Sequence, residues 1–395
     1  MPSACTSFSI FNFQFSITST MRSILVIILS VVLFHSSAAQ KKKKIAVIAY
    51  YAGRPTAVDS FPIEKITHII FCFSHLRNDS MSIGSARDSA IIENMVKLKS
   101  RNPHLKVMLS LGGWGGCQYC SPVFADSLQR KTFAKTAKDL TDYFHTDGID
   151  IDWEYPAVAG FPGHQYMKED RANFTKLMRD LRSALGPDAE ISFAAGGLKR
   201  CIDSGFEWKQ VMKYADRVNL MSYDLVSGFD TISGHHTPLY STPEQVASVD
   251  DGVKLLRKWG VPANKIAIGA AFYARIFANT KDGNKGLYQP THFYRGVPWK
   301  RFDTTFTAAK GYQKYWDKVA QAPYLYNDSL KYLVTYDDSA SIHLKTKYAM
   351  QKKLNGIMFW QLADDTYQHG LLDVIDETKK GLPAKNVNAH RRFDR

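Results

Sequence analysis

Cysteine is scarce in this sequence, with five residues among 395. Four of them lie beyond residue 39, namely Cys72, Cys117, Cys120 and Cys201. The Cys117-x-x-Cys120 pair has no second such pair and no nearby histidine, which argues against a zinc site. A disulfide within one loop is the better interpretation if the protein is exported, whereas Cys72 lies in an apolar segment typical of a buried thiol. The spacing leaves the pairing open.

Long apolar runs are also lacking. The run from Ile24 to Phe34 is too short to span a bilayer, and no other stretch resembles a membrane span. Within residues 1–39, Arg22 precedes this run and small residues follow it, which is the order of a secretory signal. Met21 is therefore a second candidate for the natural start. We expect a secreted, extracellular monomer with no membrane contact once this leader is removed.

Acidic residues are in the minority, with 37 Asp and Glu against 51 Lys and Arg and a formal net charge of +14. A nucleic-acid-binding protein gathers its basic residues on one face or stripe. Here the basic residues are scattered, apart from Lys41–Lys44 and a basic tail over residues 383–395. Scattered charge is typical of a solvated surface, so we expect no nucleic-acid partner.

No glycine-rich phosphate-binding loop follows the first apolar segment, which argues against an open, doubly wound sheet. Instead, eight short runs rich in β-branched and aromatic residues alternate with helical segments. Most of the runs are apolar on both faces, as parallel strands covered on both sides are. This repeat predicts an α/β fold, a closed (β/α)8 TIM barrel. The expected strands are residues 44–51, 66–74, 106–113, 148–154, 190–197, 217–224, 265–275 and 356–362.

Helical periodicity fills most of the intervals between these strands. The motif Thr242-Pro243-Glu244 predicts an N-cap followed by proline at the first helical position. The aromatic interval 276–335 is too long for the repeat, so we expect a small α+β insertion beside the barrel mouth. The barrel itself would then comprise residues 40–275 and 336–382. The expected helices are 88–101, 125–144, 166–185, 207–215, 244–259, 340–354 and 366–380.

The acidic segment from Asp147 to Glu154 is the most informative part of the chain. Alternate side chains of an extended strand share a face, so Asp150, Asp152 and Glu154 should point the same way. Burial and mutual repulsion raise carboxyl pKa values, so at least one acid should be protonated near neutrality. A Ca²⁺ loop would favour a flexible turn over these interleaved apolar residues. We therefore predict a metal-free site with a proton donor beside a carboxylate.

Polar and aromatic side chains collect where the predicted strands end, the edge at which such barrels build their active sites. Each aromatic alone could be core packing, but their joint placement favours a sugar-binding site. Gly112 and Gly113 could let the backbone approach the acids or a ligand closely. These strand-end residues include Tyr50, Phe73, Gly113, Trp114, Met221, Tyr223, Asp224, Tyr273, Arg275 and Trp360.

The Asp-x-x-Asp-x-Asp-x-Glu motif resembles that of glycoside hydrolase family 18. It occurs with Ser110-x-Gly-Gly, Met221-x-Tyr-Asp and the late Trp360, as in chitinases of the deep-cleft type with an α+β insertion domain. The resemblance covers residues 44–380. It implies hydrolysis of β-1,4-linked N-acetylglucosamine in chitin and chito-oligosaccharides without a cofactor. The mechanism implied is retaining and substrate-assisted, through an oxazolinium ion.

The resemblance also implies roles for individual residues. Glu154 would be the general acid and Asp152 would stabilise the acetamide, with Asp150 as its partner and Asp147 as a support. Tyr223 would hydrogen-bond the acetamide. Binding of the sugars would fall to Tyr50, Phe73, Gly113, Trp114, Asp147, Met221, Asp224, Tyr273, Arg275 and Trp360, with Trp360 as the floor.

Two departures and two alternatives accompany this hypothesis. The loop from Leu225 to Phe229 lacks a tryptophan found in some relatives, and no cysteine-rich chitin-binding module or Pro/Thr linker is visible.

A catalytically weak chitin-binding lectin, the first alternative, would typically have another residue in place of Glu154, which is present. An endo-β-N-acetylglucosaminidase acting on N-glycans would share the acids. It would usually lack the combination of Trp114, Trp360 and an aromatic insertion.

Overall fold

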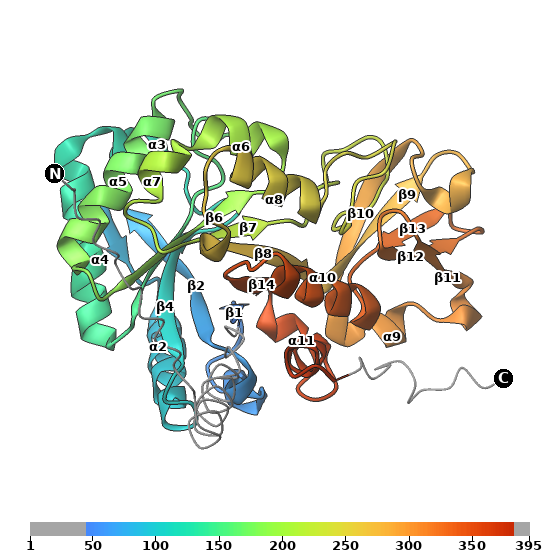
Figure 1. The fold of residues 1–395 in the computed structure, drawn as a ribbon, viewed down its shortest axis with the longest axis horizontal. Helices are drawn as coiled ribbons and strands as arrows, with labels where there is room; N and C mark the ends of the chain where they lie inside the picture. Colours follow the sequence, from blue (N-terminus) through green and yellow to red (C-terminus); the bar gives the residue numbers. More distant parts are fainter. Residues whose placement is uncertain (1–44, 383–395) are drawn as a thin grey trace, which may run out of the picture. The chain divides into compact units, whose positions relative to one another are not determined.

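The computed structural model describes residues 45–382, which are built around a closed barrel of parallel strands (Figure 1). Neighbouring strands pair in the order β1-β14-β8-β7-β6-β5-β4-β2, and pairing of β1 with β2 closes the ring. The predicted TIM barrel is thereby confirmed. Its strands are β1 (Ala46–Tyr51), β2 (His68–Arg77), β4 (Lys106–Gly112), β5 (Gly148–Asp152), β6 (Glu190–Gly196), β7 (Arg217–Met221), β8 (Ile266–Ala271) and β14 (Gly356–Trp360).

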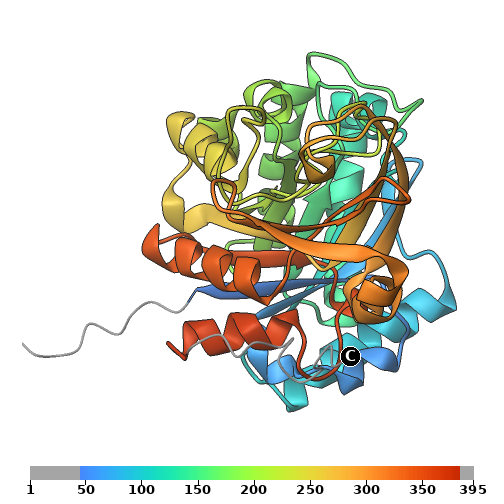
Figure 2. The same ribbon diagram turned by 90° about the vertical axis from the view of Figure 1, so that its right-hand side faces the viewer.

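Helices cover the outside of the barrel, as Figures 1 and 2 show. Helix α5, for example, turns an apolar stripe inward and buries Phe174, Leu177 and Leu181. Within residues 45–382 no helix is both long and apolar enough to cross a bilayer. The proposed leader (1–39) and the tail (383–395) lie outside the described residues. The helices are α2 (Ala86–Lys97), α3 (Cys120–Ala125), α4 (Ser127–Phe144), α5 (Asp170–Leu185), α6 (Lys199–Gly205), α7 (Trp208–Val211), α8 (Val249–Lys258), α10 (Ser339–Gln351) and α11 (Leu371–Lys379).

The helix start predicted at Thr242-Pro243-Glu244 is wrong. Helix α8 begins at Val249, and its N-cap is Ser248, whose side chain accepts a hydrogen bond from Asp251 N. Thr242 instead closes a turn, because its backbone N–H donates to Gln245 O (2.8 Å) and its hydroxyl accepts from Gln245 N (3.1 Å). The Thr-Pro-Glu pattern therefore marks a turn, because proline is favoured in turns as well as at the first position of a helix.

The predicted insertion is confirmed as a small antiparallel sheet between β8 and β14 (Figure 2). Its strand order is β10-β9-β13-β12-β11, and α9 (Phe302–Thr305) lies between β10 and β11. Phe272 alone separates β8 from β9, so the predicted strand 265–275 is two strands in different sheets. The inserted strands are β9 (Tyr273–Asn279), β10 (Thr291–Pro298), β11 (Tyr312–Asp317), β12 (Ala322–Asn327) and β13 (Tyr332–Thr335).

Candidate active site

Asp150 lies at the centre of the barrel and is fully buried. Its Oδ2 accepts hydrogen bonds from Tyr50 Oη (3.0 Å) and Ser110 Oγ (2.8 Å). Its Oδ1 accepts from Ser192 Oγ (2.6 Å) and Asn219 Nδ2 (3.2 Å). Burial raises the pKa of Asp150, and the hydrogen bonds oppose that rise. The four donors come from β1, β4, β6 and β7, so they fix the carboxylate from several sides.

Asp152 and Glu154 continue from Asp150 toward the carboxyl end of β5. Asp152 is 4% exposed, and its Oδ1 has no hydrogen-bond partner among the described residues. Burial, followed by the charges of Glu154 and Asp150, raises its pKa well above the usual range. Glu154 is 9% exposed, and burial, with a contribution from Asp224, raises its pKa to about 7. The pKa values of Asp152 and Glu154 therefore lie above their usual range, which is the direction that the sequence predicted.

Asp224 follows β7 and is clamped from the inserted sheet. Arg275 on β9 donates from Nη2 to Asp224 Oδ2 (2.5 Å) and from Nε to Oδ1, while Tyr273 Oη donates to Oδ1 (2.6 Å). The Nδ1 atom of buried His236 lies 3.4 Å from Oδ1. Burial alone would raise the pKa of Asp224, but His236 and Arg275 hold it well below its usual range. Asp224 is therefore a fixed negative charge, and its carboxylate remains partly exposed.

Aromatic rings flank the acids. Trp360 at the end of β14 stacks on Phe73, with 5.6 Å between ring centroids and 15° between planes, and Tyr50 lies 6.1 Å away. Tyr223 is buried, with its hydroxyl 3.9 Å from Met358 Sδ and its ring edge-on to Tyr273. Met221 is buried in the same interior cluster. These residues bring strands β1, β2, β7, β9 and β14 together at one edge.

Trp114 belongs to a second, open aromatic group. It is 47% exposed, and its ring lies 5.5 Å from Phe161 and 5.9 Å from Phe229. Neither Phe161 nor Phe229 was predicted from the sequence to belong to the site. Phe229 was visible as an aromatic in the loop that lacks tryptophan, whereas nothing marked Phe161, which lies in an irregular loop after Glu154.

Gly112 and Gly113 allow close backbone approach, as expected. Gly113 has φ +76° and donates its N–H to Asp152 O (2.8 Å). A Cβ on Gly113 would lie 2.4 Å from the Phe73 ring, and one on Gly112 would lie 2.2 Å from Asp152 O. Only glycine fits both positions, which hold the Trp114 loop against β5.

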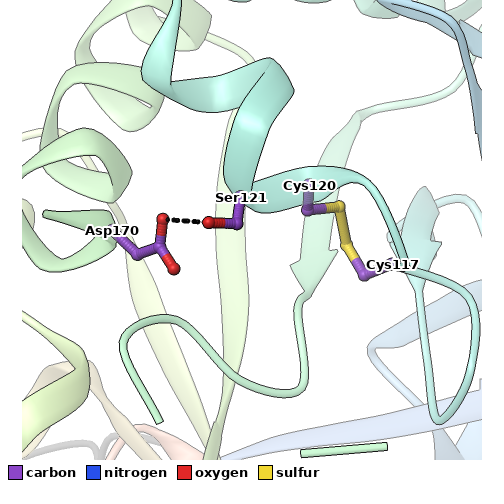
Figure 3. The surroundings of a disulfide bond; sticks show 4 residues. All are labelled: Cys117, Cys120, Ser121 and Asp170. Atoms are coloured by element: carbon purple, nitrogen blue, oxygen red, sulfur yellow. Dashed lines mark hydrogen bonds between the residues drawn. A yellow bond between two sulfur atoms is a disulfide. The ribbon is translucent and has the colours of Figure 1, made fainter. Parts of the chain in front are cut away.

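The Trp114 loop is also closed by a disulfide between Cys117 and Cys120 (Figure 3). The adjacent Ser121 Oγ donates to Asp170 Oδ1 (2.8 Å; Figure 3). Asp170 Oδ2 also accepts from Met167 N (2.8 Å). The Ser121–Asp170 contact joins the first turn of α3 to the first residue of α5, the helices that follow the Trp114 loop and the loop after Glu154. Cys72 and Cys201 are free, buried thiols.

Asp147 is the one predicted substrate-binding residue that the structure places elsewhere. It directly precedes β5, so it lies at the amino end of the strand, opposite to the acids. Its Oδ2 accepts from Val107 N (2.7 Å) and pairs with Lys99 Nζ (2.7 Å). Asp147 therefore fixes the base of β4 and β5 and does not reach the site. Within residues 45–382, no cluster of three or more His, Cys, Asp or Glu residues is placed to hold a metal.

This barrel, with three carboxylates at the end of β5 and an inserted sheet beside β8, defines a class of sugar-cleaving enzyme. The sequence profile of glycosyl hydrolases family 18 matches residues 31–365, and the chain belongs to that family.

Individual relatives support the assignment. The chain is 32% identical over 297 residues to Chitinase A1 of Niallia circulans, covering 69% of this chain but only 42% of that protein. It is 29% identical over 343 residues to Chitotriosidase-1 of Mus musculus, covering 80% and 71% of the two chains. The structure of a family 18 N-acetylglucosaminidase from Paenibacillus barengoltzii superposes with a TM-score of 0.79 at 34% identity, covering 85% of this chain and 99% of that one.

Proposed function

We propose that this protein is a chitinase that hydrolyses β-1,4-linked N-acetylglucosamine with retention of configuration. The observation that carries the proposal is the row of acids Asp150, Asp152 and Glu154, which runs from the barrel interior toward the carboxyl end of β5. The last of them, Glu154, has a pKa of about 7. A carboxyl group with that pKa can donate a proton at neutral pH and accept one later in the cycle. Similarity to Chitinase A1 of Niallia circulans and to Chitotriosidase-1 of Mus musculus supports chitin and its oligomers as substrates.

In the proposed first step, Glu154 gives its proton to the glycosidic oxygen as the bond from that oxygen to the anomeric carbon breaks. The carbonyl oxygen of the substrate's own acetamide forms the new bond to that carbon, producing an oxazolinium ion. The unpartnered Oδ1 of Asp152 is available to accept the acetamide N–H and to stabilise the positive charge. Water then attacks the anomeric carbon, and the bond from that carbon to the acetamide oxygen breaks, which restores the acetamide. Glu154 takes the proton that the water loses and becomes the acid again.

The other site residues would bind and orient the sugar. Trp360 and Phe73 would form the apolar floor, and Trp114 would extend it on the leaving-group side. Asp224, fixed by Arg275, and the Tyr223 hydroxyl would supply polar contacts to the sugar and its acetamide. Holding the acetamide against the anomeric carbon is what makes its attack fast.

The direct test is a product time course on N-acetylglucosamine oligomers of defined length. A chitinase acting within the chain releases dimers and longer fragments from a hexamer at early times. Products with the β-anomer in initial excess, detected by NMR, would support retention. No release from any oligomer, with binding intact, would identify a lectin and refute the proposal.

An N-acetylglucosaminidase is the second candidate, because such an enzyme of the same family shares 34% identity and nearly its whole length with this chain. The same time course separates the two: single sugar units would be the only early product from every oligomer. An enzyme that trims N-glycans would instead act on a high-mannose glycopeptide and leave the oligomers intact.

We also propose that the protein is exported. The order of residues in 1–39 and the disulfide Cys117–Cys120 support this, because disulfides persist in oxidising compartments. Expression of the full chain in a secreting host should yield a shortened protein in the medium. Retention of the full-length chain inside the cell would contradict the proposal.

The pH dependence should follow Glu154. The acid must be protonated in the free enzyme, so kcat/KM should fall as pH rises through about 7, the pKa of Glu154. Above that pH the loss should approach tenfold per unit. Initial rates at substrate concentrations well below KM give this profile; an alkaline limb lying below pH 5 would contradict the assignment.

Trp360→Ala should weaken binding of chito-oligosaccharides by about tenfold or more, because the stacked floor is lost. Calorimetric titration measures this affinity, and Trp259→Phe, on the outer layer beside Arg171, is the matched control. Unchanged affinity in Trp360→Ala would place Trp360 in the core and outside the binding site.

A further inference from the structure

Three polar side chains, Glu190, Arg217 and Asn219, form a line inside the barrel that leads to Asp150. Such barrels normally pack branched apolar residues in this interior. Arg217 on β7 is 2% exposed and donates from Nη1 to Glu190 on β6. Glu190 also accepts from Lys106 Nζ (2.8 Å) and lies 3.0 Å from His68 Nε2. A buried charge is costly unless it is paired, and these pairings hold Arg217 in place.

Arg217 also determines the orientation of a neighbouring amide. Its Nε donates to Asn219 Oδ1 (3.0 Å). A guanidinium can only donate, so the oxygen of the Asn219 amide must face Arg217. The amide nitrogen is thereby turned the other way, where it donates to Asp150 Oδ1 (3.2 Å) and to Tyr50 Oη (2.9 Å).

A reversed amide would have the opposite effect on Asp150. The Asn219 oxygen would then face the Asp150 carboxylate, which would relieve the repulsion only by binding a proton. With the observed orientation, all four contacts of Asp150 come from donors. The Asp152 oxygen that lacks a partner receives no such support.

We propose that Arg217 is a positioning residue for hydrolysis: by fixing the orientation of the Asn219 amide, it keeps Asp150 an ionised hydrogen-bond acceptor. The proposal rests on the function proposed above. Arg217 touches no substrate and acts only through Asn219, so its effect should be seen in the ionisation of the acids and not in sugar binding.

The other charged and titratable groups around this line are compatible with the proposal. Burial raises the pKa of Asp150, while its hydrogen bonds and the charge of Arg217 oppose the rise, so loss of Arg217 should favour protonated Asp150. Burial lowers the pKa of His68, so that His68 is neutral near pH 7 and leaves Arg217 and Lys106 as the cations facing Glu190. The titratable groups around Asp150 and Arg217 are Tyr50, Cys72, Asp152, His68, Lys106 and Glu190.

The test combines Arg217→Met with Glu190→Gln, which avoids leaving a buried carboxylate unpaired. We expect kcat on a chito-oligosaccharide to fall about tenfold, the equivalent of one charge-assisted hydrogen bond, with KM changed less than about twofold. The acidic limb of the pH–rate profile should move to higher pH, because Asp150 becomes easier to protonate.

The matched control is Arg130→Met with Asp180→Asn, which removes a buried ion pair between α4 and α5 outside the barrel. This control variant should be less stable than the wild type, but the acidic limb of its pH–rate profile should not move.

Two further variants test the contribution of the Asn219 amide separately from the charge of Arg217. Asn219→Leu should move the acidic limb in the same direction, and adding it to the Arg217 and Glu190 changes should produce no further shift. Arg217→Lys keeps a cation beside Glu190 but loses the Nε donor, so it should still move the limb. An unmoved limb, or additive shifts, would overturn the proposal, and Arg217→Lys decides the matter if the double variant does not fold.

A second readout separates this proposal from the proposed function. Carboxyl-¹³C NMR of protein labelled at aspartate, with Asp150→Asn for assignment, follows the Asp150 titration without substrate. If the wild type hydrolyses no oligosaccharide but the Arg217 variants shift this titration upward, the proposed function fails while the role of Arg217 in fixing Asp150 stands. An unshifted titration in a fully active enzyme overturns the role of Arg217 alone.

Discussion

Glu154→Gln should lower kcat on chito-oligosaccharides by about 10³-fold, within the range expected for removal of a general acid. Glutamine preserves the shape of the side chain but cannot give a proton to the leaving oxygen. Binding should survive, because the aromatic floor of Trp360 and Phe73 is untouched. The measurement pairs initial rates on a tetramer or longer oligomer with calorimetric affinity for the same ligand.

Glu93→Gln provides the matched control, because Glu93 is exposed on α2 on the outside of the barrel. It should keep full activity and affinity. Near-normal turnover by Glu154→Gln would remove Glu154 from the mechanism. Loss of affinity together with loss of rate would instead indicate that the substitution disturbs the pocket.

Asp152→Asn should lower kcat by about 10²-fold, because the neutral amide cannot stabilise the positive charge that develops on the acetamide. The pH profile should shift as well. Glu154 raises the pKa of Asp152. Repulsion between two carboxylates is mutual, so replacement of Asp152 by a neutral side chain should lower the pKa of Glu154. The alkaline limb of kcat/KM should therefore move below the wild-type position near pH 7.

Two measurements check this second prediction. The pH profile of Asp152→Asn is compared with that of the wild type, and the thermal midpoint of both proteins confirms that the barrel is intact. A reduced rate with an unchanged profile would count against stabilisation of the acetamide by Asp152. It would place Asp152 among the residues that merely support the strand.

The strand-level features were predictable from sequence because their signals are local. Period-two alternation alone puts Asp150, Asp152 and Glu154 on one face, and eight apolar runs are enough to infer a closed barrel. Strand ends then identify the edge at which Tyr50, Tyr223 and Trp360 meet. None of these inferences requires knowledge of which residues touch across the barrel.

The features that were missed depend on long-range contacts. The split at Phe272 arises because β8 pairs within the barrel while β9 pairs within the inserted sheet, and the continuous apolar run conceals the change of partner. Asp147 belongs to the same motif as the acids, but it lies before the amino end of β5. Its position at the opposite end of the strand from the site became clear only when the strand boundaries were known. The pairing of Arg217 with Glu190 joins neighbouring strands that lie 27 residues apart in the chain.

Tyr273 and Arg275 approach Asp224 from the first strand of the inserted sheet, and not from the barrel proper. The insert therefore contributes two residues of the candidate site. Excising that sheet to obtain a minimal catalyst would leave Asp224 without its guanidinium counterion and phenol donor, so trimming is a poor engineering route. Exchanging the sheet between relatives would instead transfer part of the substrate selectivity along with it.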